Sequence, residues 1–377
     1  MQILALTEGA DHVCYRYRIA PFRTALEQAG IHLQVAPLSG SWQARLAQLR
    51  AARKSDVVIL QRRLLPRWQL RLLRHWSQAL VFDFDDAIFR RSSFSPRGTT
   101  SPGRRRSFDA TVRAADLTIA GNAFLRDRAA CLMGDERIRV VPTCVDVGRY
   151  VEAGHRRAGS DTKLVWIGQR STLRYLADAR PCLAEAAARV PGLTLKIIAD
   201  VFDVDCGLPI VPHIWSEATE AVEIADADIG ISWLSDDDWS RGKCGLKVLQ
   251  YMAAGLPVVA NPVGVQQEMV VDGHTGFLAS TPAEWGAAIV RLARDPALRR
   301  RLGANGRRLV SERYGVARWA PEFVSAMQSL CRYEVSFTKV RLPSAAPGTR
   351  LDPPREAAHN LAEEDAREQA PHLPSAG

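Results

Sequence analysis

Short apolar runs alternate with helix-like stretches along most of this chain, and they fall into two series. The strand-like runs lie at residues 3–6, 33–36, 56–60, 80–84, 117–120 and 139–141, and then at 163–167, 195–199, 228–233, 257–260 and 277–278. Such runs, joined by helices, are typical of parallel strands with both faces covered. The pattern predicts an α/β protein with two Rossmann-like, doubly wound domains that face a central cleft.

The boundaries of these domains follow from length and local composition. A chain of 377 residues is too long for one core. We expect an N-terminal domain over residues 1–150, a linker over 151–161 and a C-terminal domain over 162–335, whose last helix can pack back on the N-terminal domain. Residues 336–377 lack any periodicity, which predicts a disordered tail. The serine-, glycine- and proline-rich stretch 91–107 is interpreted as a loop.

Composition excludes several classes of protein. The seven cysteines include no CxxC pair, which indicates reduced thiols. No apolar run approaches the roughly 20 residues that a transmembrane helix needs. The first residues lack the basic and apolar regions of a secretory signal. We therefore expect a cytoplasmic protein.

Basic residues are concentrated in a few places. The formal net charge is +9, and residues 61–75 hold five arginines and no acid, interleaved with leucines and Trp68. This mixture fits a helix that lies on an anionic membrane surface, although an ordinary solvated helix face has the same composition. No zinc finger, RNA-recognition signature or helix-turn-helix is recognisable, so nucleic acid is not expected as a partner.

The segment 242–278 holds the strongest indication of a ligand. It reads as a glycine turn, a helix, a buried strand and a second glycine turn, the order expected where a diphosphate lies across the carboxyl ends of a parallel sheet. Lys243 and Lys247 would share a helix face near a free helix N-terminus, which makes an anion site. Gln250 can pair with a ribose diol. The alternative is a solvated amphipathic helix with incidental lysines.

Polar groups that follow other strands extend this site. Arg170 comes just after Gly168 at the end of a predicted strand, where a guanidinium can bind a diphosphate in a bidentate manner. Backbone amides near Gly264 and Val265 can reach a sugar or a phosphate. Glu268 is placed to accept hydrogen bonds from sugar hydroxyls, unless it is a capping or surface carboxylate.

These motifs resemble those of a known family. The helix GKCGLKVLQYMA, the strand GLPVVA and the turn DGHTGFL are similar to the donor-binding half of the GT-B glycosyltransferases of retaining family 4, the glycosyl transferases group 1. Further matching segments are residues 83–86, 120–122, 142–146, 166–168 and 228–231. The resemblance covers roughly residues 1–330. Most of that family have two glutamates where this chain has Gly242 and Gln250.

The resemblance implies a reaction. A sugar would pass from a nucleotide-diphosphate sugar, bound by the C-terminal domain, to a hydroxyl group of a glycan, a lipid-linked intermediate or a small molecule. The anomeric configuration would be retained by a front-face substitution. No metal or other cofactor is expected, and the adjacent aspartates at 236–238 would point in different directions. The resemblance also implies polysaccharide biosynthesis for the cell envelope, by a protein loosely attached to the inner face of the cell membrane.

The resemblance also implies roles for individual residues. The donor-binding residues are expected to be Gly9, Gly168, Arg170, Ser171, Lys243, Gly245, Leu246, Lys247, Gln250, Gly264, Val265 and Glu268. The catalytic candidates are Asp85, Asp86, Arg170 and Lys247, and the acceptor-binding candidates are Tyr15, Arg16 and Arg18. Asp85 stands where the family often has a histidine. Both aspartates have an alternative role in capping the next helix.

Two other functions stay open. A non-catalytic nucleotide-sugar-binding or scaffold protein of the same fold would explain Gly242 and Gln250 at the glutamate positions. A nucleotide-sugar epimerase would also use this fold, but it would need a pair of acid and base residues that the sequence does not show.

Overall fold

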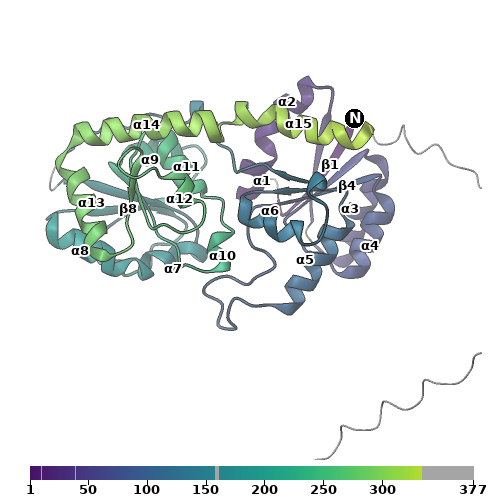
Figure 1. Ribbon diagram of the computed structural model, residues 1–377, viewed down its shortest axis with the longest axis horizontal. Helices are drawn as coiled ribbons and strands as arrows, with labels where there is room; N and C mark the ends of the chain where they lie inside the picture. The colour runs from purple at the N-terminus through teal and green to yellow at the C-terminus, as the bar shows by residue number, and fades with distance from the viewer. Residues whose placement is uncertain (10, 39, 158–160, 333–377) are drawn as a thin grey trace, which may run out of the picture. The chain divides into compact units, whose positions relative to one another are not determined.

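The computed structural model describes residues 1–9, 11–38, 40–157 and 161–332, and it contains two parallel six-stranded sheets, each flanked by helices (Figure 1). The first sheet has the order β2-β1-β3-β4-β5-β6 and the second has the order β12-β11-β10-β7-β8-β9. We call each sheet with its helices the first and the second domain. The predicted α/β fold with two Rossmann-like domains is confirmed.

The elements of the first domain alternate between strand and helix. The strands are β1 (Gln2–Thr7), β2 (His32–Pro37), β3 (Val57–Gln61), β4 (Ala79–Phe84), β5 (Leu117–Ala120) and β6 (Ile138–Val140). The helices are α1 (Val13–Arg18), α2 (Arg23–Gln28), α3 (Trp42–Arg50), α4 (Arg67–Trp76), α5 (Pro102–Ala114) and α6 (Ala123–Ala130), with short 3-10 turns η1 (Ala20–Phe22), η2 (Ala51–Lys54), η3 (Asp135–Arg137) and η4 (Val147–Arg149).

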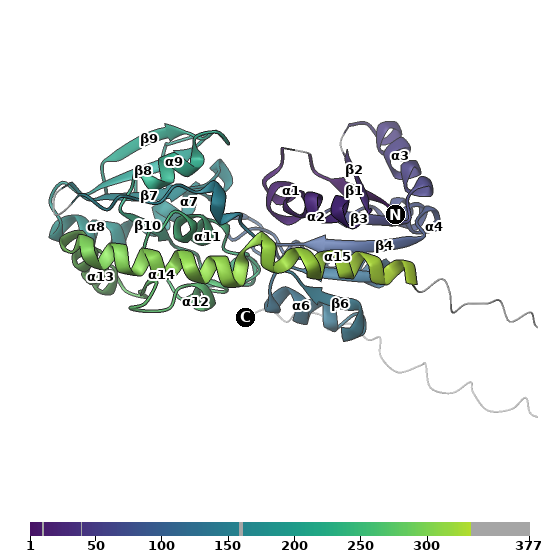
Figure 2. The ribbon, with the colours of Figure 1, turned by 90° about the horizontal axis from the view of Figure 1, so that it is seen from above.

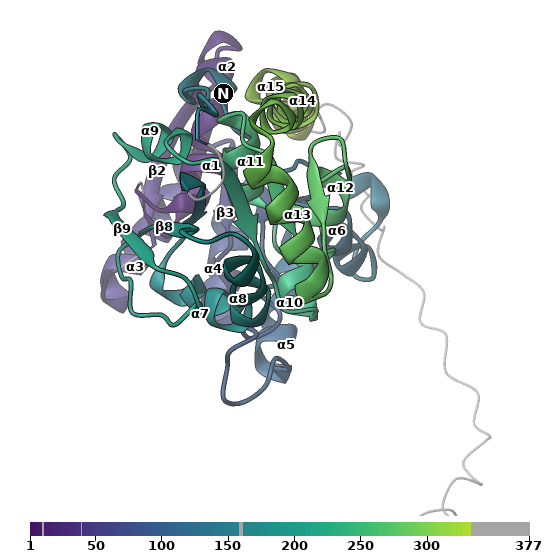
Figure 3. The same ribbon diagram turned by 90° about the vertical axis from the view of Figure 1, so that its left-hand side faces the viewer.

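The second domain repeats this alternation. Its strands are β7 (Lys163–Ile167), β8 (Thr194–Ala199), β9 (Ile210–Ile214), β10 (Ile229–Ser232), β11 (Val258–Ala260) and β12 (Gly276–Leu278). Its helices are α7 (Arg170–Asp178), α8 (Arg180–Arg189), α9 (Glu220–Ala225), α10 (Asp238–Arg241), α11 (Leu246–Ala253), α12 (Gln266–Met269), α13 (Pro282–Arg294) and α14 (Pro296–Tyr314). Helices α8 and α13 pack against each other beside the sheet (Figure 3).

Strand order places the sites where a ligand is expected. In the first sheet the chain runs from β1 to β2 in one direction and from β3 to β4 in the other. In the second sheet it runs from β7 to β8 in one direction and from β10 to β11 in the other. In open α/β sheets, ligands bind at the carboxyl ends of the strands where this divergence occurs. The residues after β1, β3 and β7 are therefore the first to inspect.

All eleven predicted strands are present. They could be recognised because central strands such as β3, β4 and β10 are fully buried and therefore mostly apolar in sequence. The missed strand is β9, an edge strand that contains Pro212 and is only partly buried. Proline is tolerated at a sheet edge, where its missing N–H is not needed. The stretch 91–107 is only partly a loop, since α5 begins at Pro102 with Ser101 as its N-cap.

The chain crosses between the two domains twice, side by side. The N–H of Val145 donates to the carbonyl of Tyr314, and the N–H of Val316 donates to the carbonyl of Val145. Helix α15 (Val316–Arg332) then continues from α14 onto the first domain (Figure 2). There the ring of Phe323 stacks on that of Phe22, with ring centroids 4.5 Å apart. The predicted tail at 336–377 lies outside the described residues.

None of the helices in the described ranges is both long enough and apolar enough to cross a membrane.

Candidate functional site

Lys247 lies at the carboxyl end of β7, where the second sheet is expected to bind a ligand. Its Nζ donates to the carbonyl oxygen of Ile167, the last residue of β7, at 2.8 Å and lies 4.1 Å from the centre of the Trp166 ring. Its Nζ forms no ion pair with any carboxylate of the described residues. Burial, together with the nearby charge of Lys243, lowers the pKa of Lys247 to about 7. An anion at this point would supply the missing negative charge.

Lys243 lies just before α11 and contacts the first domain. Its Nζ is 3.3 Å from Oδ1 of Asp86 and 5.0 Å from the centre of the Trp239 ring. Burial lowers the pKa of Lys243, but the charge of Asp86, the nearby Tyr175 and the hydrogen bond to Asp86 together leave this pKa above its usual value. The lysine is therefore a cation that is held by a carboxylate from across the domain boundary.

Arg62 completes this group of charges, and the sequence argument did not single it out. It follows β3 with φ 61°, and its Nη2 is 2.6 Å from Oδ2 of Asp86. Its Nη1 is 3.7 Å from Asp85 and donates to the sulfur of Cys14 at 2.5 Å. A left-handed backbone at an arginine is uncommon and is retained where the surroundings require it. Its position at the end of a buried strand is a signal that could have identified Arg62 as a site residue. It was instead counted with the neighbouring arginines of the basic stretch 61–75.

Glycines let the two domains meet at the start of α11. A Cβ built on Gly242 would lie 2.6 Å from the backbone nitrogen of Ala87, the residue after Asp86. Gly245 is the N-cap of α11 with φ 66°, and Leu246 begins the helix. The absence of a side chain at position 242 therefore permits the contact between Asp86 and Lys243.

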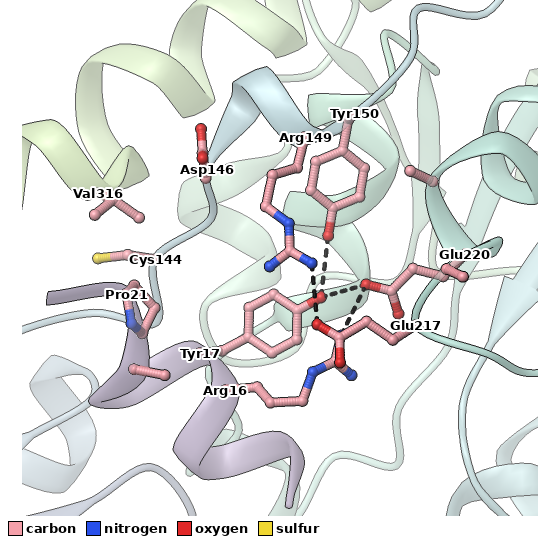
Figure 4. Close-up of a pocket in the computed structure, with 13 residues that line it drawn as sticks. Arg16, Tyr17, Pro21, Cys144, Asp146, Arg149, Tyr150, Glu217, Glu220 and Val316 are labelled. Carbon is pink, nitrogen blue, oxygen red and sulfur yellow. Dashed lines mark hydrogen bonds and ion pairs between the residues drawn. The ribbon is translucent and has the colours of Figure 1, made fainter. Parts of the chain in front are cut away.

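Gln250 contacts the first domain instead of presenting a free amide. Its Nε2 donates to the hydroxyl of Tyr17 at 3.1 Å. This hydroxyl donates to Oε1 of Glu220 at 2.6 Å and lies 3.1 Å from the hydroxyl of Tyr150 (Figure 4). Burial and the neighbours Tyr150 and Glu220 raise the pKa of Tyr17. A ribose diol at Gln250 would have to share or displace the tyrosine. Tyr17 is a second residue that the sequence argument missed.

Beside this network lies a cavity of about 550 Å³ with charges of both signs (Figure 4). Arg16 Nη2 is 3.2 Å from Glu217 and 3.4 Å from Glu220, and Arg149 also pairs with Glu217 at 3.0 Å. The guanidinium of Arg16 lies 5.1 Å from the centre of the Trp215 ring. Arg16 thus lines this cavity while it pairs with carboxylates of the second domain, and its role in acceptor binding stays a prediction.

The other two acceptor candidates are buried inside the first domain. Arg18 is 2% exposed, with Nη2 2.5 Å from Oδ1 of Asp83, and it also donates to the carbonyl of Val141. Tyr15 is buried in the core of the first domain, and its hydroxyl accepts a hydrogen bond from Arg23. A buried charge is stable only when paired, so Arg18 is committed to Asp83.

The remaining donor candidates lie in three places. Gly264, Val265 and Glu268 line a second cavity of about 300 Å³ together with Asn122 to Phe124 of the first domain. A Cβ on Gly245 would be 3.1 Å from Val265, so this cavity borders the start of α11.

Gly168 directly follows Ile167, the residue that contacts Lys247, and Arg170 and Ser171 are the first two residues of α7. The side chains of Arg170 and Ser171 are exposed, and no hydrogen bond or ion pair in the described part of the chain holds the Arg170 guanidinium. Gly9 ends the turn after β1, and a Cβ there would have no neighbour within 4 Å. The donor and catalytic roles of these residues stay predictions.

The three adjacent aspartates of the second domain have separate partners. Asp236 pairs with Arg241, Asp237 caps α10, and Asp238 pairs with Arg90 of the first domain at 2.5 Å.

Comparison with known proteins shows to which proteins this chain is similar. Residues 155–295 match the family model described as Glycosyl transferases group 1. The glycogen synthase of Mycobacterium tuberculosis (strain ATCC 25618 / H37Rv) is 27% identical over 212 residues, which are 53% of this chain and 51% of that protein. The D-inositol 3-phosphate glycosyltransferase of Streptomyces bingchenggensis is 40% identical over 73 residues, 19% of this chain and 16% of that protein. The match with glycogen synthase therefore spans about half the length of that relative.

Solved structures share the fold over nearly the whole described chain. HepE from Anabaena, solved in complex with UDP and glucose, has a TM-score of 0.63 at 16% identity and covers 87% of this chain and 100% of its own. Sucrose-phosphate synthase from Thermosynechococcus elongatus has a TM-score of 0.64 at 18% identity and covers 89% of this chain and 98% of its own. Residues 155–295 therefore form a domain of the glycosyl transferases group 1, within a chain that has the two-domain GT-B fold of glycosyltransferases.

Proposed function

We propose that this protein is a glycosyltransferase that moves a sugar from a nucleotide-diphosphate sugar to a hydroxyl group of an acceptor, with retention of configuration. The observation that carries the proposal is the ammonium group of Lys247, which lies at the carboxyl end of β7 without an acidic partner in the described residues. The match of residues 155–295 to the glycosyl transferases group 1 supports it.

The charges of the site fit the departure of a diphosphate. In the transfer, the bond between the sugar C1 and the diphosphate oxygen breaks, and the acceptor oxygen bonds to C1 from the same face. The acceptor proton passes to the leaving diphosphate. Lys247, Lys243 and the amides at the start of α11 would stabilise the negative charge that develops on the leaving group. These groups can act without a metal ion.

Nucleotide binding tests the donor site first. The UDP-, GDP- and ADP-sugars are tested one by one in the presence of EDTA. We expect the sugars of one of these three bases to raise the melting temperature of the protein. With a matching acceptor the same compound should release its nucleoside diphosphate, and NMR of the product should show the anomeric configuration of the donor. Well-folded protein that no nucleotide sugar stabilises would contradict the proposal. Binding without transfer to any acceptor would favour the scaffold alternative.

The acceptor is proposed to be a lipid-linked or polysaccharide intermediate at the inner face of the cell membrane, because of the surface of α3 and α4. The two helices pack together and expose Trp42 (61%) and Trp68 (48%), and Arg67 and Arg71 are exposed on α4. Exposed tryptophans among arginines favour the interface of an anionic bilayer. This surface supports a cytoplasmic protein with peripheral attachment.

Vesicle binding tests this surface. We expect the protein to sediment with vesicles that contain phosphatidylglycerol and not with phosphatidylcholine alone, and less so at high salt. Replacement of Trp42 and Trp68 together by alanine should weaken binding about tenfold or more, since each ring buries a large apolar area. Ile214→Ala, at an exposed position of β9, is the control. Equal sedimentation of the double variant would contradict the assignment.

A further inference from the structure

The two lysines of the proposed donor site differ in their partners. Lys247 has no carboxylate in ion-pair range among the described residues, whereas Lys243 lies 3.3 Å from Oδ1 of Asp86. The other oxygen of Asp86 lies 2.6 Å from Nη2 of Arg62. One carboxylate of the first domain is therefore shared between an arginine of its own domain and a lysine of the other domain.

The shared carboxylate is held more firmly on the side of the first domain. Its distance to Arg62 is shorter, and Arg62 is fixed by its backbone, whose N–H donates to the carbonyl of Asp83 at 2.7 Å, and by its contact with Cys14. The side chain of Asp86 is 12% exposed and that of Lys243 is 20% exposed, so the pair is poorly screened by water. If Lys243 moves to another anion, Asp86 keeps a cationic partner.

We propose that Asp86, held by Arg62, is an internal counter-ion of Lys243 that competes with the diphosphate of the donor for this lysine. The inference rests on the proposed function and goes beyond it. Before binding, the carboxylate neutralises Lys243 and connects the two domains. On binding, the diphosphate takes over the ammonium group, and the carboxylate stays with Arg62. Asp86 is then a positioning residue that limits how tightly the nucleoside diphosphate is held after the transfer.

The sign of the effect separates this role from a structural one. Loss of a competing anion should tighten diphosphate binding, while loss of a merely structural carboxylate should weaken it or leave it unchanged. We expect Asp86→Asn to bind inorganic pyrophosphate and the matching nucleoside diphosphate (UDP, GDP or ADP) about three- to tenfold more tightly, measured by calorimetry in EDTA. The nucleoside diphosphate should also dissociate more slowly.

Two further variants make the test specific. Asp238→Asn removes another ion pair between the domains, Arg90 with Asp238, without touching Lys243, and its affinity should stay within about twofold of the wild type. Asp86→Asn should tighten binding no further when Lys243 is already methionine. If Asp86→Asn does not fold, as judged by circular dichroism, Asp86→Ser takes its place.

The outcomes separate the two proposals. A wild-type protein that binds none of these diphosphates would overturn the proposed function, and this inference with it. A wild-type protein that binds them, together with an Asp86→Asn variant whose affinity is equal or weaker, would overturn the counter-ion role alone. Tightening in Asp238→Asn as large as in Asp86→Asn would also overturn it, because the gain would then come from looser contact between the domains.

Discussion

Replacement of Lys247 by alanine is expected to lower kcat/KM for the donor by about 10²- to 10³-fold, the usual loss when one positioned cation or donor no longer stabilises a developing negative charge. The ammonium group lies at the end of β7, where we expect the diphosphate from the strand order of the second sheet. Its charge has no acidic partner among the described residues, so a bound diphosphate would be its counter-ion. Steady-state kinetics with the donor found in the binding screen measure the effect.

The same lysine predicts how donor binding depends on pH. Without ligand its pKa is lowered to about 7 by burial and by the charge of Lys243, and a diphosphate binds the protonated form. Donor affinity should therefore be highest below pH 7 and should fall as the pH rises above 7, because binding must then be accompanied by uptake of a proton. In Lys247→Arg the side chain stays charged, so this fall should disappear.

The controls for Lys247 separate charge from folding. Alanine removes a half-buried cation that has no acidic partner in the described residues, so the free energy of unfolding should stay the same or rise. Lys54→Ala, at an exposed position of η2, should leave kcat/KM unchanged. Donor affinity that is flat between pH 6 and 9 in the wild type, or normal kinetics of Lys247→Ala, would show that the diphosphate binds elsewhere.

The strands could be predicted from the sequence because their physical signal is local. A buried strand such as β3 or β10 has both faces covered and is apolar at nearly every position. The edge strand β9 has no such signal, because half-buried positions and Pro212 make it read as a loop. The start of α5 was missed because serine, proline and glycine are common both in loops and at the beginning of a helix.

The candidate site could be predicted only where a single segment determines it. Lys243, Gly245 and Lys247 lie close together because one helix carries or borders all of them. The partners of Gln250 and Arg16 belong to the other domain and lie more than 200 positions away in the sequence. A local sequence pattern therefore cannot predict these contacts. Arginines are especially difficult to assign from sequence. An arginine that is buried against a carboxylate, such as Arg18, cannot be distinguished by sequence from one that is free to bind a ligand.

Gly242 shows how a departure from the family pattern can be read once the structure is known. The resemblance leads one to expect a glutamate there, yet a Cβ at this position would lie 2.6 Å from the backbone nitrogen and from the Cβ of Ala87. The backbone of Gly242 has φ −76°, which any residue adopts, so only space forbids a side chain. Because Ala87 belongs to the first domain, the missing side chain permits the approach of the two domains.

Gly242→Ala is therefore expected to hold the two domains apart and to lower kcat about 10²-fold, as misplacement of reacting groups by about 1 Å does. Each domain keeps its own core, so the melting temperature should change little. Gly242→Glu, which restores the residue of the family, should be no more active than the alanine variant. The distance between labels on the two domains, measured by fluorescence transfer with the donor bound, should increase in both variants.

The control for Gly242 is Gly103→Ala, in α5, where a Cβ would meet no atom within 4 Å and kcat should not change. A Gly242→Glu variant that is more active than the wild type would show that the chain had lost a catalytic carboxylate at this position. A Gly242→Ala variant with normal kcat would show that turnover does not need the contact with Ala87. With kcat lowered in both variants, turnover would require the glycine, because only a residue without a side chain lets the two domains approach closely at Ala87.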